Sequence, residues 1–154
     1  MTLDPGELQL MSGIGDVVRL AVAPVFLLSG VGTMLMLFTN RLARAVDRSR
    51  ELERMAAGAT SPQVRRGLQE NLASLARRGR LLSTAITLAA ICALLVSVVV
   101  VALFLGAALQ VGVGLLIGAL FVGAMLSFTG AILCFLREVF IATRTLRSGL
   151  HRLR

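Results

Sequence analysis

The chain has 154 residues, of which 56% are hydrophobic, and its mean hydropathy is +0.86. These values exclude an ordinary soluble globule and predict one membrane domain over residues 1–154. The net charge of +8 comes from sixteen basic residues, all of them Arg. A basic chain can bind nucleic acid, but these charges flank apolar segments, so we expect no nucleic-acid partner.

Residues 1–16 contain three acidic residues and no basic one, and we expect them to lie outside the membrane. Asp4 and Pro5 are typical of a helix start, which predicts a short helix that runs from Pro5 through Leu8, Leu10 and Met11. Gly13 and Gly15 then allow a bend before the first span.

Residues 17–39 form the first spanning candidate, since about 20 apolar residues cross a bilayer core. The segment is less apolar than the later spans because it contains Pro24 and several hydroxyl residues. Arg19 lies near one end, where its side chain can reach the headgroups.

Residues 40–80 contain ten Arg and four acidic residues, a net charge of +6. Apolar residues at helical spacing continue the first span outwards until residues 57–60 interrupt the pattern. Ser61 and Pro62 then restart a helix that leads into the next span. We therefore expect an antiparallel helical hairpin that extends the first and second spans beyond the bilayer.

Residues 81–136 contain no Asp, Glu, Lys or Arg. A single helix over these residues would measure roughly 84 Å, far more than any bilayer core. Two spans fit instead, over 81–105 and 113–136. The turn between them is expected at 106–112, where Gln110 is the most polar residue.

The distribution of Arg predicts the orientation. Residues 40–80 carry a net +6, and the tail at 137–154 carries five Arg and one Glu. Because basic loops stay in the cytoplasm, the hairpin and the C-terminus should lie inside, with the N-terminus outside. The expected fold class is an all-α membrane protein with three transmembrane helices and a cytoplasmic antiparallel helical hairpin that extends the first and second spans.

Small residues recur at four-residue spacing in the second and third spans. Helices in lipid associate through the close approach of such residues. We expect them to form the seam between these two spans or, alternatively, a seam between subunits. They are Ala85, Ala89, Ala93 and Ser97 on the second span, and Gly114, Gly118, Ala119, Gly123, Ser127 and Ala131 on the third.

A polar stripe follows the first span at steps of three and four residues, and two interpretations of it stay open. In the first, its hydroxyls bond within the helix and it packs against the other spans. In the second, several copies assemble with the stripe lining a pore and Arg residues forming basic rings at its inner mouth. The stripe is Ser29, Thr33, Met36 and Asn40, extended by Arg41, Arg44 and Arg48.

A polar network is expected where the inner ends of the three spans meet. Glu138 directly follows the third span and can pair with Arg residues of the other two helices. We expect these residues to act as a structural clamp that ties the helix ends together. The clamp consists of Asn40, Arg41, Arg80, Arg137 and Glu138.

The sequence contains no catalytic constellation. The single histidine, His151, lies in the basic tail, where a solvated side chain is the simpler interpretation. Cys92 and Cys134 fall inside the spans, where a thiol behaves as a small hydrophobe. No zinc or haem ligand spacing occurs. We therefore expect no enzymatic activity, no metal and no cofactor.

Two motifs carry a resemblance to a known family. Residues 20–32 (LAVAPVFLLSGVG) and 39–48 (TNRLARAVDR) resemble an uncharacterised bacterial family of small membrane proteins, catalogued as a domain of unknown function of the 2721 type. Arg77-Arg78 and the FLREV sequence over 135–139 are similar to further signatures of that family. The resemblance covers roughly residues 17–143. It implies a three-span protein of the bacterial inner membrane and no particular activity.

Three spans enclose little interior, so a pathway between subunits is favoured over one within a chain. The leading hypothesis is an oligomeric ion channel or transport pore lined by the first span. The alternative is a non-conducting scaffold or regulatory subunit whose Arg-rich cytoplasmic hairpin docks a partner. The expected partners are anionic lipid headgroups at the cytoplasmic face, further copies of the chain and, in the alternative, a cytoplasmic protein.

Overall fold

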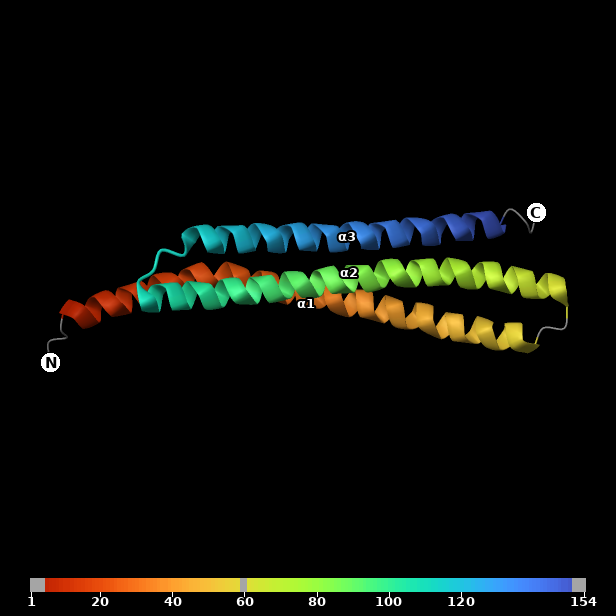
Figure 1. The fold of residues 1–154 in the computed structure, drawn as a ribbon, viewed down its shortest axis with the longest axis horizontal. Helices are drawn as coiled ribbons and strands as arrows, with labels where there is room; N and C mark the ends of the chain where they lie inside the picture. The colour runs from red at the N-terminus through yellow and green to blue at the C-terminus, as the bar shows by residue number, and fades with distance from the viewer. Residues whose placement is uncertain (1–4, 59–60, 151–154) are drawn as a thin grey trace. The chain divides into compact units, whose positions relative to one another are not determined.

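The computed structural model describes the backbone of residues 5–58 and 61–150 and the side chains of residues 18–58 and 61–142. The described residues form three α-helices and no strand (Figure 1). These helices are α1 (Pro5–Gly58), α2 (Pro62–Leu109) and α3 (Gly114–Leu150). Asp4 and His151, both singled out in the sequence, lie outside the described residues.

All three helices are long and apolar enough to cross a membrane. Many of their large apolar side chains point outwards, among them Phe26 at 75% exposure, Leu94 at 63% and Leu115 at 91%. So much exposed apolar surface is unfavourable in water and suited to lipid, while the helices satisfy their own backbone hydrogen bonds. The protein is an all-α, multi-pass membrane protein, as its sequence predicts.

The chain divides into two compact units, and each helix contributes a segment to both. The first unit is Met1–Thr33 with Ala89–Phe128, and the second is Met34–Leu88 with Thr129–Arg154. Three acidic residues and Arg19 are the charged residues in the sequence of the first unit. The other twenty charged residues of the chain belong to the second unit, which therefore holds the candidate charged sites.

Helix α1 is continuous from Pro5, which corrects the predicted short helix and bend. Gly13 and Gly15 lie inside this helix instead of ending one. A glycine costs only about 1 kcal/mol in a helix interior. Extending an existing helix adds a hydrogen bond per residue without a new nucleation cost, so two glycines are not enough to break it. Pro24 also lies inside α1, where it is buried.

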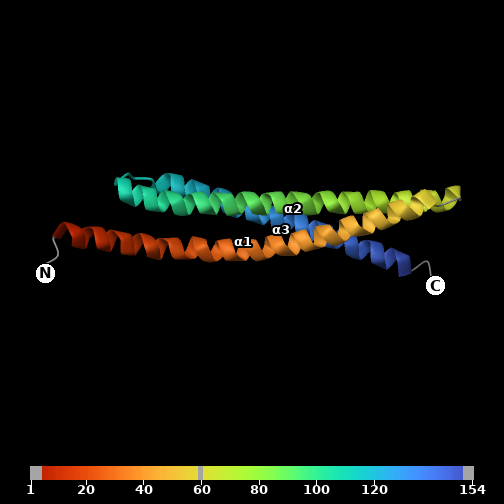
Figure 2. The same ribbon diagram turned by 90° about the horizontal axis from the view of Figure 1, so that it is seen from below.

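The second unit contains the predicted antiparallel hairpin, formed by α1 from Met34 onwards and α2 up to Leu88 (Figures 1 and 2). Helix α1 ends at Gly58, within the segment where the apolar pattern is interrupted. Helix α2 begins at Pro62, and the Arg65 N–H donates a hydrogen bond to the Ser61 carbonyl at 3.1 Å. Helix α1 thus ends and helix α2 begins where the sequence pattern is interrupted and restarts.

In the first unit, the connection between α2 and α3 covers residues 110–113, so it is shorter than the predicted turn at 106–112. Helix α2 ends in a Schellman motif, in which the Val111 N–H donates to the Gly106 carbonyl at 3.1 Å and Gln110 has a φ of 55°. A Cβ atom at Gly106 would collide with the Val113 side chain, so this close approach requires glycine.

Buried residues recur with a seven-residue period along each helix. On α1, Val31 and Phe38 are seven apart, and on α3, Ala124 and Ala131 are seven apart. Steps of three and four alternate on α2, and the average of 3.5 residues keeps one face towards the neighbouring helices, as in a coiled coil. The buried hydrophobic side chains of α2 are Leu82, Ala85, Ala89, Cys92, Val96 and Val99.

Candidate functional site

The side chain of Glu138 is 2% exposed and lies at the centre of a charged cluster in the second unit. Its Oε1 accepts hydrogen bonds from Arg78 Nη2 at 2.8 Å and Arg78 Nε at 3.1 Å. Its Oε2 accepts one from Arg41 Nη1 at 3.1 Å. Both carboxylate oxygens are therefore satisfied by guanidinium groups from the other two helices.

Two phenylalanines form an apolar layer next to these charges. Phe38 on α1 is fully buried, and its ring centroid lies 5.0 Å from that of Phe135 on α3. The guanidinium carbon of Arg41 lies 5.0 Å from the Phe135 centroid, within the range of a cation–π contact. The pairs Phe38/Arg41 and Phe135/Glu138 are each three residues apart, so each pair shares one helix face. We call Phe38, Arg41, Arg78, Phe135 and Glu138 the Glu138 cluster.

Burying a carboxylate is costly unless charged donors replace the lost water. In the Glu138 cluster two guanidinium groups do so, and the three ionised groups together carry a net charge of +1. Arg41 and Arg78 remain 36% and 27% exposed, so water screens part of their charge. The cluster holds three helices at one point along the bundle and presents positive charge at its surface.

The structure brings together only part of the predicted clamp. Arg41 and Glu138 are bonded, whereas the Asn40, Arg80 and Arg137 side chains are exposed and take no part in the cluster. The essential partner that sequence reasoning missed is Arg78. Arg78 lies seven residues before the buried Ala85, so the seven-residue period could have identified it.

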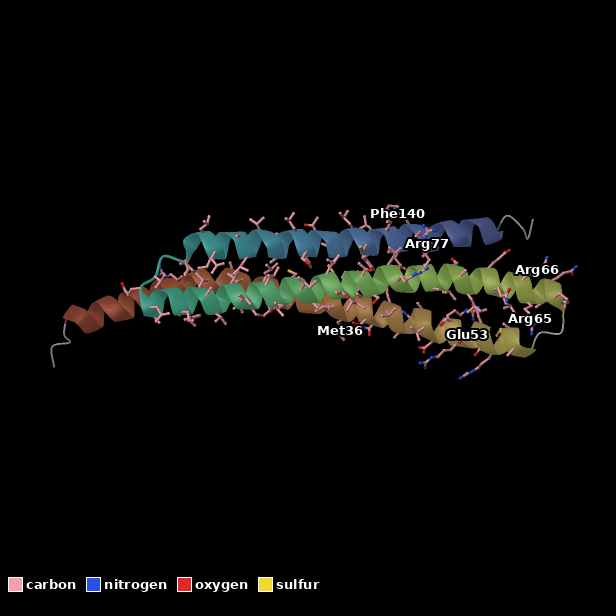
Figure 3. The ribbon with its side chains drawn as sticks, in the orientation of Figure 1. Met36, Glu53, Arg65, Arg66, Arg77 and Phe140 are labelled. Carbon is pink, nitrogen blue, oxygen red and sulfur yellow. The ribbon has the colours of Figure 1, made fainter. Side chains whose placement is uncertain are left out.

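The remaining clamp residues line a separate groove between α2 and α3 in the second unit. This basic groove has a volume of about 500 Å³. Figure 3 shows Arg77, one of its residues, extending from α2. The groove is lined by Arg77, Arg80, Leu81 and Thr84 of α2 and by Arg137 and Ile141 of α3. Arg77 and Arg137 thus line the basic groove, whereas their sequence neighbours Arg78 and Glu138 belong to the Glu138 cluster.

The polar stripe of α1 is exposed in both units. In the first unit, the Thr33 hydroxyl donates to the Ser29 carbonyl at 3.1 Å, and the Ser29 hydroxyl donates to the Val25 carbonyl at 3.4 Å. In the second unit, Met36 is 69% exposed and projects away from α1 (Figure 3), and Asn40 is also exposed.

The exposure of the stripe follows from helix geometry. Ser29 and Thr33 each lie two positions from the buried Val31, and Met36 and Asn40 each lie two positions from the buried Phe38. Two positions correspond to about 200° around a helix, so the stripe faces away from the buried side. Arg44 and Arg48 are also exposed, whereas Arg41 bonds to Glu138 and therefore does not extend the stripe.

The predicted small-residue seam is buried only in part. Ala85, Ala89 and Ala131 are fully buried, Ala93, Gly123 and Ser127 are half-buried, and Ser97, Gly114, Gly118 and Ala119 are exposed. A constant step of four residues turns about 40° further around the helix each time, so such a stripe leaves the interface after two or three steps. A close approach between α2 and α3 that sequence reasoning missed is at Gly130, where a Cβ atom would lie 3.3 Å from Leu88 Cδ1.

Among residues 18–58 and 61–142, no group of three His, Cys, Asp or Glu side chains could hold a metal ion. Comparison with curated proteins and comparison with solved structures each found no similar protein. A family model described as "Protein of unknown function (DUF2721)" matches residues 21–148, which include the polar stripe, the Glu138 cluster and the basic groove. Since this match covers well over half of the chain, the protein belongs to that family.

Proposed function

We propose that the protein is a homo-oligomeric pore for small anions in a bacterial inner membrane, lined by α1. The observation that carries this proposal is the exposed polar stripe of α1, which faces away from the buried side of its own helix. Hydroxyl and amide groups on a membrane helix are suited to lining a shared aqueous path. The proposal therefore assigns the stripe to contacts between copies of the chain.

The interior of a single chain does not support such a path. Among the described residues, Glu138 is the one buried charged or polar side chain, and Arg41 and Arg78 occupy its oxygens. The other buried side chains are apolar, and water is not stable in a packed apolar interior. A conducting path therefore requires several copies arranged with their stripes around a common axis.

The Arg residues next to the stripe favour anions over cations. Arg44 and Arg48 are exposed and border a groove of about 300 Å³ that also reaches Arg78 and Glu138. In a symmetric assembly, each of these two Arg residues would form a ring of positive charge at one mouth of the pore. The excess of Arg in this part of the chain favours a cytoplasmic position for that mouth.

The test is ion flux through liposomes that contain the full-length protein. Wild-type protein should conduct anions in preference to cations. The double variant Arg44→Glu/Arg48→Glu should reverse this preference because both rings change sign. If wild-type liposomes conduct no ions and nanodiscs contain a single chain, the pore is excluded.

A matched control reverses two charges elsewhere. Arg65 and Arg66 lie near the start of α2, at the far end of the hairpin (Figure 3). The variant Arg65→Glu/Arg66→Glu makes the same change in net charge as the pore variant. It should leave the ion selectivity unaltered, because these residues belong to α2 and lie at the end of the hairpin that is remote from the stripe on α1.

The hairpin favours a second candidate function, a non-conducting scaffold or regulatory subunit. An open groove of about 380 Å³ runs between its two helices and is lined mostly by apolar and small residues, including Val46, Leu72 and Leu75. Apolar side chains exposed outside the lipid are typical of protein contacts. In this case Arg65→Glu/Arg66→Glu should weaken the capture of a soluble partner, and no variant should affect ion flux.

A further inference from the structure

We infer that the basic groove binds the phosphate group of an anionic phospholipid. The groove lies between α2 and α3 in the second unit and has a volume of about 500 Å³. Three guanidinium groups line it, from Arg77 and Arg80 on α2 and from Arg137 on α3. It is separate from the exposed stripe of α1, so this inference does not depend on the proposed pore.

The charges of the groove are not neutralised by the described residues. Among the side chains of residues 18–58 and 61–142, no carboxylate lines the groove, and none forms a salt bridge with its three Arg residues. The nearest acidic residue in sequence, Glu138, is bonded to Arg41 and Arg78 in the Glu138 cluster. Three like charges at one groove repel one another, and an anion bound among them removes that repulsion.

A phosphate group matches the donors that the groove offers. The planar guanidinium group donates paired hydrogen bonds to phosphate oxygens, which favours phosphate over a small spherical anion. Thr84 adds a hydroxyl group at the same groove, although this hydroxyl donates to the Arg80 carbonyl at 2.9 Å. The phosphate would therefore be held mainly by guanidinium groups.

The position of the groove favours a lipid over a soluble phosphate. Arg80 and Arg137 are the charged residues that flank the charge-free segment 81–136 on its two sides. The groove therefore lies where the apolar spans end, which is the level of the phospholipid headgroups whichever way the protein is oriented. Leu81 and Ile141 line the same groove and offer apolar contacts to the lipid chains. Basic pockets between membrane helices bind anionic headgroups in this way.

The test measures the binding of phosphatidylglycerol to the detergent-solubilised full-length protein by native mass spectrometry. Wild-type protein should bind phosphatidylglycerol in preference to phosphatidylcholine. Because each Arg near the headgroups contributes about a fivefold gain in affinity, Arg77→Gln/Arg80→Gln should weaken the binding about 30-fold. The single variant Arg137→Gln, which removes the one Arg that α3 contributes, should weaken phosphatidylglycerol binding about fivefold.

The control variant Arg65→Gln/Arg66→Gln removes the same number of charges at the start of α2. Equal losses in the groove and control variants would show general attraction between charges and would overturn the inference. Displacement of phosphatidylglycerol by inorganic phosphate at similar concentration would also overturn it, because the ligand would then be a soluble phosphate. All substituted residues are exposed, so the variants should fold, and unchanged thermal unfolding would verify this.

Discussion

Glu138 shows how one buried charge organises three helices. Its two oxygens accept hydrogen bonds from Arg41 of α1 and Arg78 of α2. The sequence predicted a polar network with Glu138 and Arg41 in it, but it favoured Arg80 as the partner from α2. Arg78 and Arg80 differ by about 200° around the helix, so only one of them can face Glu138.

The bond between Arg78 and Glu138 should have a measurable energy. In a double-mutant cycle with Arg78→Ala and Glu138→Ala, we expect a coupling of about 1.5–3 kcal/mol, because hydrogen bonds to charged groups are strong when one partner is buried. The measurement is equilibrium unfolding in mixed detergent micelles.

The exposed pair Arg54–Glu51 is the control for this cycle. Its atoms are 3.8 Å apart and its side chains are 80% and 47% exposed. Exposed pairs at helical spacing contribute about 0.3–0.5 kcal/mol, so this cycle should give a much smaller coupling. A coupling for Arg78 and Glu138 no larger than that of the exposed pair would contradict the structural role of the cluster.

At the scale of helices, the period of the buried residues decides which small residues pack. Four-residue spacing predicted a seam through Ser97 and Gly118, and both residues are exposed. The burial period of 3.5 residues instead selects Ala85, Ala89 and Ala131, which are fully buried. The sequence contains both patterns, and tertiary contacts are needed to tell them apart because small residues are frequent throughout these spans.

Two glycines of α3 should respond differently to the same substitution. At Gly130, a new Cβ atom would lie 3.3 Å from Leu88 Cδ1, whereas at Gly118 no heavy atom lies within 4 Å. Gly130→Leu should therefore destabilise the protein by about 1–3 kcal/mol through overpacking. Thermal unfolding in detergent measures this loss.

The variant Gly118→Leu is the matched control and should not destabilise the single chain. If the exposed Gly114 and Gly118 form a seam between subunits, Gly118→Leu should instead lower the number of chains per nanodisc. If Gly130→Leu and Gly118→Leu lower the thermal stability equally, the close contact between Gly130 and Leu88 is not the cause of the loss.

At the scale of the whole molecule, charge separates the two units. The sequence of the first unit contains four charged residues, and that of the second contains twenty. This distribution agrees with an apolar unit within lipid and a second unit that continues into water. The same excess of Arg predicts that the hairpin lies in the cytoplasm.

This orientation is testable with single cysteines on a background in which Cys92 and Cys134 are replaced by Ala. Ser61→Cys should react with a membrane-impermeant maleimide only after the membrane is opened, because the hairpin is expected inside. Gly112→Cys, at the α2–α3 connection, should react in intact cells. The reverse pattern would invert the topology and place the proposed basic rings at the outer mouth.

The sequence by itself determined the number of spans, the hairpin and the segment of each helix that carries charge. These follow from one-dimensional quantities, because the length of an apolar segment and the positions of charged residues are fixed along the chain. Only the tertiary structure decided how each helix is rotated about its own axis. That rotation selects Arg78 for Glu138, leaves Arg80 and Arg137 in the basic groove and exposes the stripe of α1, because each depends on which faces pack together.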